Sequence, residues 1–297
     1  MSALEPHCSF LLLPDKLPSA DNITFLETSF FTKHRELLPT PAEVREAAGP
    51  ISKIFRPPPV SFPSMNLIVK YGRSITKAEG QCLWAVHRLC PNVPVPEVYG
   101  WCQDGGETFI YTQLIGGATL EHEWPGMDVE EKYEICTQLH GMLNELRQLR
   151  QDPSDQFIGT INRQPVQDVI FEHKHFEVFS DVTSFHDWFS GVVMSHMDLS
   201  DPDRWRPGLL DEVPIVFTHA DLHRSNIMMT WDANGKPRVA GIVDWHQSGW
   251  YPACWEFYKT RHTARESEQW EIDFILEFLQ SYRGYISWDY FALKRGR

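Results

Sequence analysis

The sequence lacks most of the patterns that mark membrane, metal-ribbon and nucleic-acid-binding proteins. No stretch reaches about 18 consecutive apolar residues, so no membrane span is expected. The first residues, MSALEPHCSFLLLPDK, have no basic start and do not resemble a signal peptide. No C-x-x-C pair occurs, which excludes zinc-ribbon spacing, and no dense Lys/Arg run occurs. Neither a nucleic acid nor a membrane is therefore an expected partner.

The charge of the chain is strongly acidic. It holds 27 Lys and Arg against 40 Asp and Glu, a formal net charge of −13 over 297 residues. This balance repels polyanions and is compatible with a small cationic substrate. Several of the six cysteines lie inside apolar helical patterns, where a free thiol behaves as a small hydrophobic group. Reduced thiols indicate a cytoplasmic protein.

The residue pattern changes at Gly116-Gly117, which we interpret as a hinge between two lobes, residues 1–115 and 116–297. In the first lobe we expect three strands and one helix, at residues 66–71, 97–102, 107–115 and 76–89. An Asp104-Gly105-Gly106 turn favours a hairpin between the last two strands. In the second lobe we expect helices and a short β insertion, at residues 128–150, 185–199, 270–282 and 214–244. A cleft between lobes is a natural ligand site.

The segment PIVFTHADLHRSNIMMTWDANGKPRVAGIVDWHQ, residues 214–247, gathers potential oxygen ligands. Asn234-Gly235 is a strong hairpin turn signal between two apolar runs. Asn226 precedes Gly235 by nine residues and Asp244 follows it by nine, so their side chains should meet at the open end of the hairpin. An amide oxygen and a carboxylate suit Mg²⁺. Asp221, five residues before Asn226, would stand beside this metal site as a catalytic base for phosphoryl transfer.

Other roles remain open for these residues, either in the structure of the loop or in a zinc site. Each Asp or Asn alone is typical of turns. His219 is a candidate catalytic residue or ligand, but it could equally bind the backbone and shape the loop. A zinc site is the other alternative, with ligands drawn from His219, Asp221, His223, His173 and His175.

The run from His219-Ala-Asp221 to Asn226, followed by Ile242-Val-Asp244-Trp245, resembles the aminoglycoside phosphotransferase family, particularly its fungal branch. The likeness extends over roughly residues 50–285. It implies an α+β, bilobal, protein-kinase-like fold, with an antiparallel-sheet N-lobe that binds nucleotide and a mainly helical C-lobe for catalysis and acceptor binding. Glu256 follows the metal-binding Asp by about a dozen residues and would anchor the loop.

The first lobe offers the remaining parts of a kinase site. Lys70 shares a strand face with Ile68 and would hold the α- and β-phosphates. Glu79 lies on the apolar stripe of the next helix and would pair with Lys70, although Thr76 and Glu79 could instead form a capping box. By resemblance to the family hinge, the Gln113 carbonyl and the Ile115 N–H would contact adenine.

One expected part is missing from the sequence. Residues 52–65, SKIFRPPPVSFPSM, precede Lys70 and contain no glycine, whereas a phosphate loop needs free backbone N–H groups.

The catalytic segment and the family resemblance together predict a small-molecule kinase with Mg²⁺, ATP or GTP as donor and a small hydroxylated acceptor. The alternative is a nucleotide-binding pseudokinase or scaffold protein with the same fold.

Overall fold

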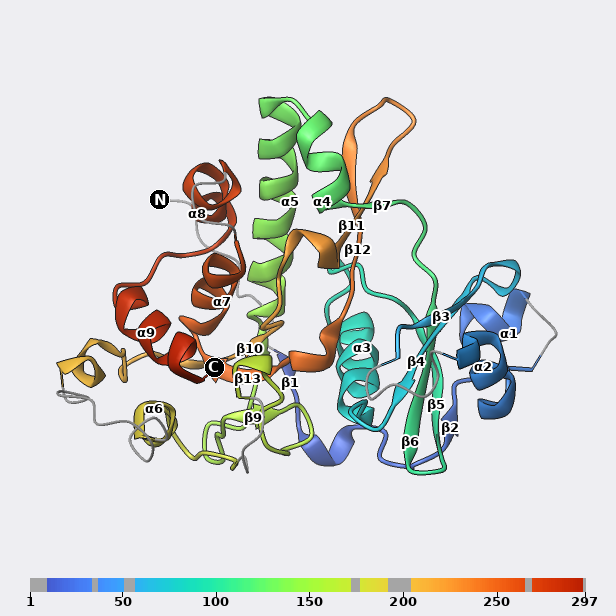
Figure 1. Cartoon of the computed structure of the whole chain (residues 1–297), viewed down its shortest axis with the longest axis horizontal. Coiled ribbons are helices and arrows are strands. Elements are labelled where there is room, and N and C mark those ends of the chain that lie inside the picture. The colour runs from blue at the N-terminus through green and yellow to red at the C-terminus, as the bar shows by residue number, and fades with distance from the viewer. Residues whose placement is uncertain are drawn as a thin grey trace.

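The computed structural model describes residues 10–33, 37–50, 57–171, 177–191, 204–264 and 269–295, which form two lobes (Figure 1). The first lobe is built on an antiparallel sheet of order β2-β5-β6-β4-β3. Its strands are β2 (Ile23–Thr24), β3 (Val60–Phe62), β4 (Leu67–Gly72), β5 (Val98–Asp104) and β6 (Glu107–Gln113). Asp104 pairs with Glu107 across two glycines of positive φ, which confirms the expected hairpin.

Helices cover both faces of this sheet. Helices α1 (Ser29–Lys33) and α2 (Pro41–Ala48) bury the face that carries alternate residues of β4, namely Leu67, Val69 and Tyr71. Helix α3 (Lys77–Leu89) covers the other face. A Cβ at Gly80 would lie 2.8 Å from the Trp101 ring, so a glycine lets α3 approach the sheet this closely.

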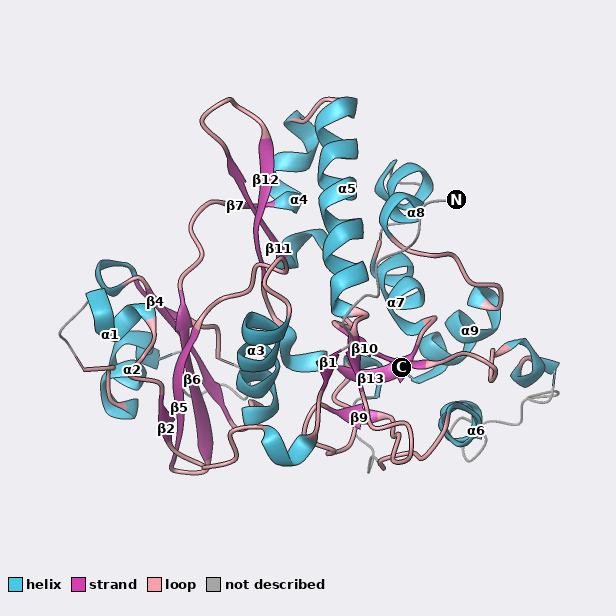
Figure 2. Ribbon diagram, turned by 180° about the vertical axis from the view of Figure 1, so that it is seen from behind, coloured by secondary structure: helices cyan, strands magenta, loops and turns pink. Residues whose placement is uncertain are grey.

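The second lobe is mainly helical (Figure 2). Its helices are α4 (Leu120–Glu123), α5 (Val129–Leu146), α6 (Val182–Gly191), α7 (Trp255–Thr263), α8 (Ile275–Phe278) and α9 (Tyr285–Arg295). Helix α5 begins after Asp128, whose carboxylate accepts from the Glu131 N–H at 2.8 Å, while the Glu131 side chain accepts from the Asp128 N–H. This capping box confirms the expected helix start.

Three expected helices differ in extent. The helix expected over 128–150 ends at Leu146, and Leu149–Arg150 form strand β8 instead. Helix α6 ends at Gly191, and the rest of the segment predicted over 185–199 lies outside the described residues. The helix expected over 270–282 is wrong at its C-terminal end. It consists of a π-helical turn (Trp270–Phe274) and α8, and Leu279 is already extended. Burial of Trp270, Phe274 and Phe278 sets this path.

A hairpin of β11 (Ile227–Trp231) and β12 (Pro237–Ile242) rises beside α5, and β7 (Ala118–Thr119) adds a third strand (Figure 1). A Cβ on Gly117 would lie 2.1 Å from the Met229 carbonyl oxygen, and its φ is +112°. Gly117 therefore places the chain against the hairpin as it leaves the first lobe.

The N-terminal part of the chain crosses between lobes. Strand β1 (Phe10–Leu11) pairs in parallel with β8 (Leu149–Arg150) of the second lobe, while β2 joins the first-lobe sheet. A small sheet of order β10-β13-β9 completes the second lobe, with strands at Ile215–Thr218, Gly249–Pro252 and Gly159–Thr160. Residues 10–12 thus lie on the second lobe, although the sequence assigned residues 1–115 to the first.

The remaining sequence-level expectations about membranes and thiols can be compared with the described residues. Within these ranges, no helix combines the length and hydrophobicity needed to cross a bilayer. The five described cysteines are free thiols, as expected, and burial raises the pKa of Cys90, Cys136 and Cys254 to about 12.

Candidate active site

Lys70 joins the two lobes through two carboxylates. It lies on β4, on the face opposite Leu67 and Val69, as its place in the strand predicts. Its Nζ lies 2.5 Å from Glu79 Oε1 on α3 and 2.6 Å from Asp244 Oδ1, which is 174 residues away in the chain. Burial alone would lower the pKa of Lys70, but the charges of Glu79 and Asp244 outweigh it and raise that pKa.

Glu79 is used for this ion pair and not as a helix cap. Thr76 occupies the N-cap position of α3, yet its side chain caps no backbone N–H. Glu79 is 3% exposed, and its second carboxylate oxygen, Oε2, is buried without a hydrogen-bond partner. A buried carboxylate needs a cation beside it, so the geometry supports the pairing with Lys70 over the capping alternative.

The loop that carries Asp221 is held by a buried acid. Glu256, at the start of α7 and fully buried, accepts from the His219 N–H at 2.7 Å and from the Ala220 N–H at 3.1 Å. This confirms the expectation that Glu256 anchors the loop. Ala220 has φ +64°, a left-handed conformation that is uncommon without glycine and is fixed here by those hydrogen bonds.

His219 uses both ring nitrogens on the backbone. Its Nε2 lies 3.0 Å from the Val243 carbonyl oxygen, and its Nδ1 lies 3.2 Å from the Asp221 N–H. A neutral ring protonated on Nε2 satisfies both contacts. His219 is 1% exposed, so the geometry favours a loop-shaping role over contact with a substrate.

Asn226 is fixed against Asp221. Its amide nitrogen donates to the Asp221 carbonyl oxygen at 2.8 Å and to Asp221 Oδ2 at 3.1 Å. Because the nitrogen is engaged in this way, the amide oxygen is the group that Asn226 can offer to a metal ion. The Val243 N–H donates to the Asn226 carbonyl, so Asn226 aligns with Val243 and not with Asp244. The pairs next to the turn, Trp231 with Pro237 and Thr230 with Arg238, are symmetric about Asn234 and not about Gly235, which is why the symmetric count of nine and nine is wrong. A bulge between Met228 and Met229 then moves the register by one residue, which brings Asn226 opposite Val243.

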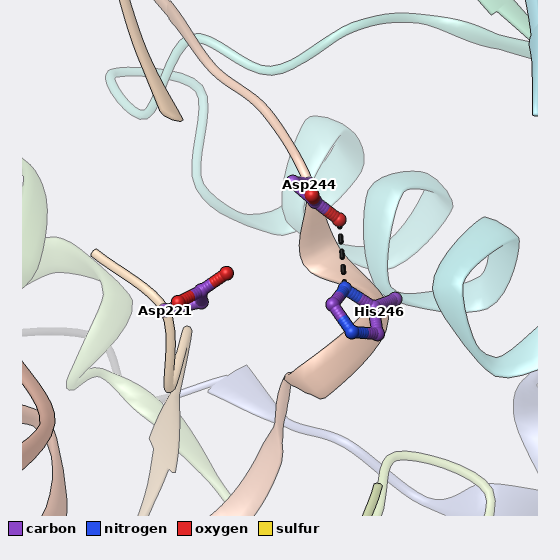
Figure 3. A group of neighbouring side chains, drawn as sticks. All are labelled: Asp221, Asp244 and His246. Atoms are coloured by element: carbon purple, nitrogen blue, oxygen red, sulfur yellow. Dashed lines mark hydrogen bonds and ion pairs between the residues drawn. The ribbon is translucent and has the colours of Figure 1, made fainter. Parts of the chain in front are cut away.

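Asp244 binds both Lys70 and His246, and Asp221 lies across from the Asp244–His246 pair (Figure 3). We call Lys70, Glu79, Asp221, Asp244 and His246 the charged cluster. The φ of Asp244 is +65°, and its Oδ1 also lies 2.7 Å from Nδ1 of His246. Burial would raise the pKa of Asp244, but the hydrogen bond with His246 and the charge of Lys70 outweigh it and hold that pKa well below its usual range. Burial opposes the charged form of His246 as well, and its bond to Asp244 nevertheless raises its pKa.

Asp221, Asp244 and His246 each place one ligating atom within 4.8 Å of the others. The Asp244 carboxylate and the Asn226 amide supply hard oxygen atoms of the kind Mg²⁺ prefers, so these two residues fit the ion, with the Asp221 carboxylate beside them. Asp221, Asp244 and His246 are the group of candidate metal ligands found among the described residues. His223 binds Ser225 instead, and His173 and His175 lie outside the described residues. The described residues thus lend no support to a zinc site built on His219.

A cavity of about 260 Å³ adjoins this cluster. Six residues singled out from the sequence line it together: Lys70, Glu79, Gln113, Ile115, Asn226 and Asp244. Apolar side chains, among them Leu83, Ile110 and Met228, form the rest of the wall. An apolar slot at the strand end, open toward a lysine and two metal-binding groups, suits a planar base with attached phosphates.

The turn before Lys70 differs from a glycine-rich loop. Strands β3 and β4 are joined by a 3₁₀ turn at Pro63–Met65, which ends at Asn66 in a left-handed conformation of φ +50°. Pro59 lies in the wall of the 260 Å³ cavity. Few backbone N–H groups are therefore available from this turn for phosphate.

His246 and the loop over residues 162–171 are the parts of the site that the sequence alone did not reveal. His246 follows Asp244 by two residues, and this spacing in Asp-Trp-His was the available signal. The loop carries no motif. Asp168 in it is 4% exposed and binds Lys259 Nζ at 2.7 Å, a pair that sequence patterns do not connect.

Solved structures of aminoglycoside phosphotransferases are similar to this chain. Among solved structures, a type VIII aminoglycoside-3'-phosphotransferase is 16% identical, with a TM-score of 0.47, over 77% of this chain and 84% of that one. The aminoglycoside phosphotransferase APH(3'')-Id from Streptomyces rimosus is 14% identical, with a TM-score of 0.45, over 80% and 87%. No curated protein matches.

The family assignment comes from the sequence itself. Residues 76–294 match the sequence model of the Phosphotransferase enzyme family, which covers well over half of the chain. The matched range includes Glu79, the loop from His219 to Asn226, and Asp244. The α+β architecture of sheet lobe and helical lobe agrees with the expected fold. This chain belongs to the phosphotransferase enzyme family.

Proposed function

We propose that this phosphotransferase moves the γ-phosphoryl group of ATP or GTP to a hydroxyl group of a small molecule. One observation carries the proposal. Lys70, Glu79 and Asp244 form a continuous charged contact between the lobes, with Asp221 within 4.8 Å of Asp244. Positioning and charge stabilisation are the main demands of phosphoryl transfer, and these groups supply both.

Each residue has a defined part in the proposed reaction. Asp221 accepts the proton of the acceptor hydroxyl, whose oxygen bonds to the γ-phosphorus while the bond from that phosphorus to the bridging oxygen breaks. The nucleoside diphosphate then leaves with that oxygen. Lys70 binds the α- and β-phosphates, and Glu79 orients Lys70. Asn226 and Asp244 would hold Mg²⁺, which supplies positive charge beside the phosphates.

The nucleotide base would occupy the 260 Å³ cavity. Gln113 and Ile115 line it at the end of β6, where the chain leaves the first lobe, and in our proposal their backbone groups contact the base. A direct comparison of the affinities for ATP and GTP decides whether adenine or guanine binds.

A nucleotide-binding pseudokinase is the second candidate, favoured by the turn at Pro63–Met65 in place of a glycine-rich loop. The retained charged groups favour the enzyme. The two functions differ in one measurable property, which is turnover of bound nucleotide.

The test compares Asp221→Asn and Asp221→Ala with the unaltered chain in Mg²⁺-dependent hydrolysis of ATP and GTP, and in transfer to a panel of hydroxylated acceptors. Loss of the base should lower turnover by about 10²–10⁴-fold. Nucleotide affinity, measured by calorimetry, should change little because Asp221 does not line the nucleotide cavity.

Asp187→Asn is the control, since this Asp is exposed on α6 and carries the same charge change. Full turnover in Asp221→Ala would refute the assigned base. Nucleotide binding without turnover toward water or any acceptor, at high enzyme concentration, would favour the pseudokinase.

A further inference from the structure

A second and larger cavity, about 980 Å³, meets the nucleotide cavity at the charged cluster. The two linings share no residue. His246 lines the larger cavity and Asp244 lines the smaller, and their side chains are hydrogen-bonded at 2.7 Å. The pair therefore forms the partition between the two spaces.

Both lobes build the larger cavity. The first lobe contributes residues 74–78, at the start of α3, with Gln103 of β5 and Thr108 of β6. The second lobe contributes the loop over 162–171. Because ligating atoms of Asp221 and His246 lie within 4.8 Å of each other, a molecule in this cavity would reach the proposed base. The cavity is thus placed to hold the phosphoryl acceptor, an assignment that rests on the proposed function.

The charged groups in its wall are already paired. Asp168 is 4% exposed and binds Lys259 Nζ at 2.7 Å and the Trp255 indole N–H at 2.9 Å. Lys77 Nζ binds Asp21 Oδ1 at 2.8 Å. Among the described lining residues of this cavity, the one carboxylate, that of Asp168, is therefore already paired with a cation. The carboxylate left for a ligand is that of the proposed base, Asp221, whose Oδ2 accepts from the Asn226 amide. A molecule carrying several ammonium groups would lose water there with a single opposite charge to bind.

Neutral polar groups are abundant in the same wall. Ser74, Gln103 and Thr108 have side chains that make no hydrogen bond among the described residues, and Gln164 and Gln167 add amides. Such groups pair with hydroxyls without a charge. Further lining residues are apolar, namely Ile75, Ala78, Pro165, Val166, Val169 and Phe171. These can cover the C–H faces of a ring.

We propose that the acceptor is an uncharged, polyhydroxylated molecule of sugar size, held in this cavity with one hydroxyl at Asp221. This differs from the cationic substrate with which the net charge of the chain is compatible. The residues that line the larger cavity, and not the net charge of the chain, determine whether a neutral or a cationic acceptor is preferred.

The test measures binding by saturation-transfer NMR to protein loaded with Mg²⁺ and a non-hydrolysable ATP analogue. The probes are matched pairs of neutral and 2-amino sugars: glucose with glucosamine, galactose with galactosamine, and mannose with mannosamine. Gentamicin serves as a polycation. In at least one pair the neutral sugar should bind more tightly than its amino partner and than gentamicin.

Two variants localise the binding. Val169 is exposed in the cavity wall, so Val169→Trp should narrow the cavity and lower the affinity for the neutral sugar about fivefold. Val129→Trp makes the same change on α5, outside the cavity lining, and should bind normally. Gln167→Glu adds a carboxylate of nearly the same shape as the amide. It should raise the affinity for the amino sugar about fivefold relative to the affinity for its neutral partner.

Preference for the amino sugars or gentamicin, or the absence of any neutral sugar whose binding responds to Val169→Trp, would overturn the inference. The proposed function has a separate readout. Phosphoryl transfer to a cationic acceptor would support the proposed kinase function and refute the inference that the acceptor is neutral. Binding of a neutral sugar without phosphoryl transfer would support the inferred binding site and refute the proposed kinase function.

Discussion

At the scale of single residues, the loop that carries Asp221 is held by one buried side chain, Glu256. Glu256 accepts two backbone N–H groups, those of His219 and Ala220, and the left-handed Ala220 directly precedes Asp221. Glu256 is therefore a positioning residue. Its carboxylate fixes the direction in which Asp221 leaves the loop.

Glu256→Gln replaces one accepting oxygen by an amide that cannot accept. One buried N–H then loses its partner, and the free energy of unfolding should fall by about 1–3 kcal/mol. Turnover should fall as well, while the KM for nucleotide stays close to its original value, since Glu256 does not line the nucleotide cavity. Urea denaturation and steady-state kinetics check both effects. Unchanged turnover in a destabilised variant would show that Glu256 only supports the fold.

Several single residues could be placed from the sequence because their signals are local. Lys70 follows from strand alternation, and Glu79 from its position on the apolar stripe of α3. The predicted pairing of Asn226 with Asp244 was less accurate, because the hairpin is centred on Asn234 and not on Gly235, and a count along the sequence cannot foresee either this centre or the bulge at Met228 and Met229. His246 was missed since its importance comes from the hydrogen bond to Asp244.

At the scale of elements, the start of α5 is specified by its own sequence. Asp128 and Glu131 exchange two hydrogen bonds, one in each direction, so two otherwise unpaired N–H groups are satisfied. This explains why the sequence could predict that a helix begins at this point. The end of the segment over 270–282 could not be predicted, because contacts among Trp124, Trp270 and Phe274 override the helical pattern.

Asp128→Ala should lower the free energy of unfolding by about 1 kcal/mol, as the loss of an N-cap does elsewhere. Glu130→Ala is the matched control, since Glu130 lies in the same first turn but makes no cap. Chemical denaturation of both variants measures the difference. An equal effect in the two variants would mean that charge near the helix start, and not the cap, is responsible.

At the scale of the whole molecule, residues 10–24 connect the lobes along a second path, besides the link through Gly116-Gly117. Strand β1 and Leu12 lie on the second lobe, where the Leu12 N–H donates to the Arg150 carbonyl at 2.8 Å. Farther along, the Pro18 carbonyl accepts from the Gln81 side chain of α3 and the Ala20 carbonyl accepts from the Trp101 indole. The sequence did not predict this crossing, because two strands of two residues each carry no local signal for the strands with which they pair.

Leu12 and Leu11 provide a matched test of this connection, because Leu12 is 5% exposed and its neighbour Leu11 is 55% exposed. Leu12→Ala removes buried apolar surface and should lower the free energy of unfolding by about 2–4 kcal/mol. Leu11→Ala should change it by less than about 0.5 kcal/mol. Released from the second lobe, residues 10–24 should also be cleaved faster by protease in Leu12→Ala alone. Equal stability and equal cleavage in the two variants would show that the N-terminal segment does not hold the lobes together.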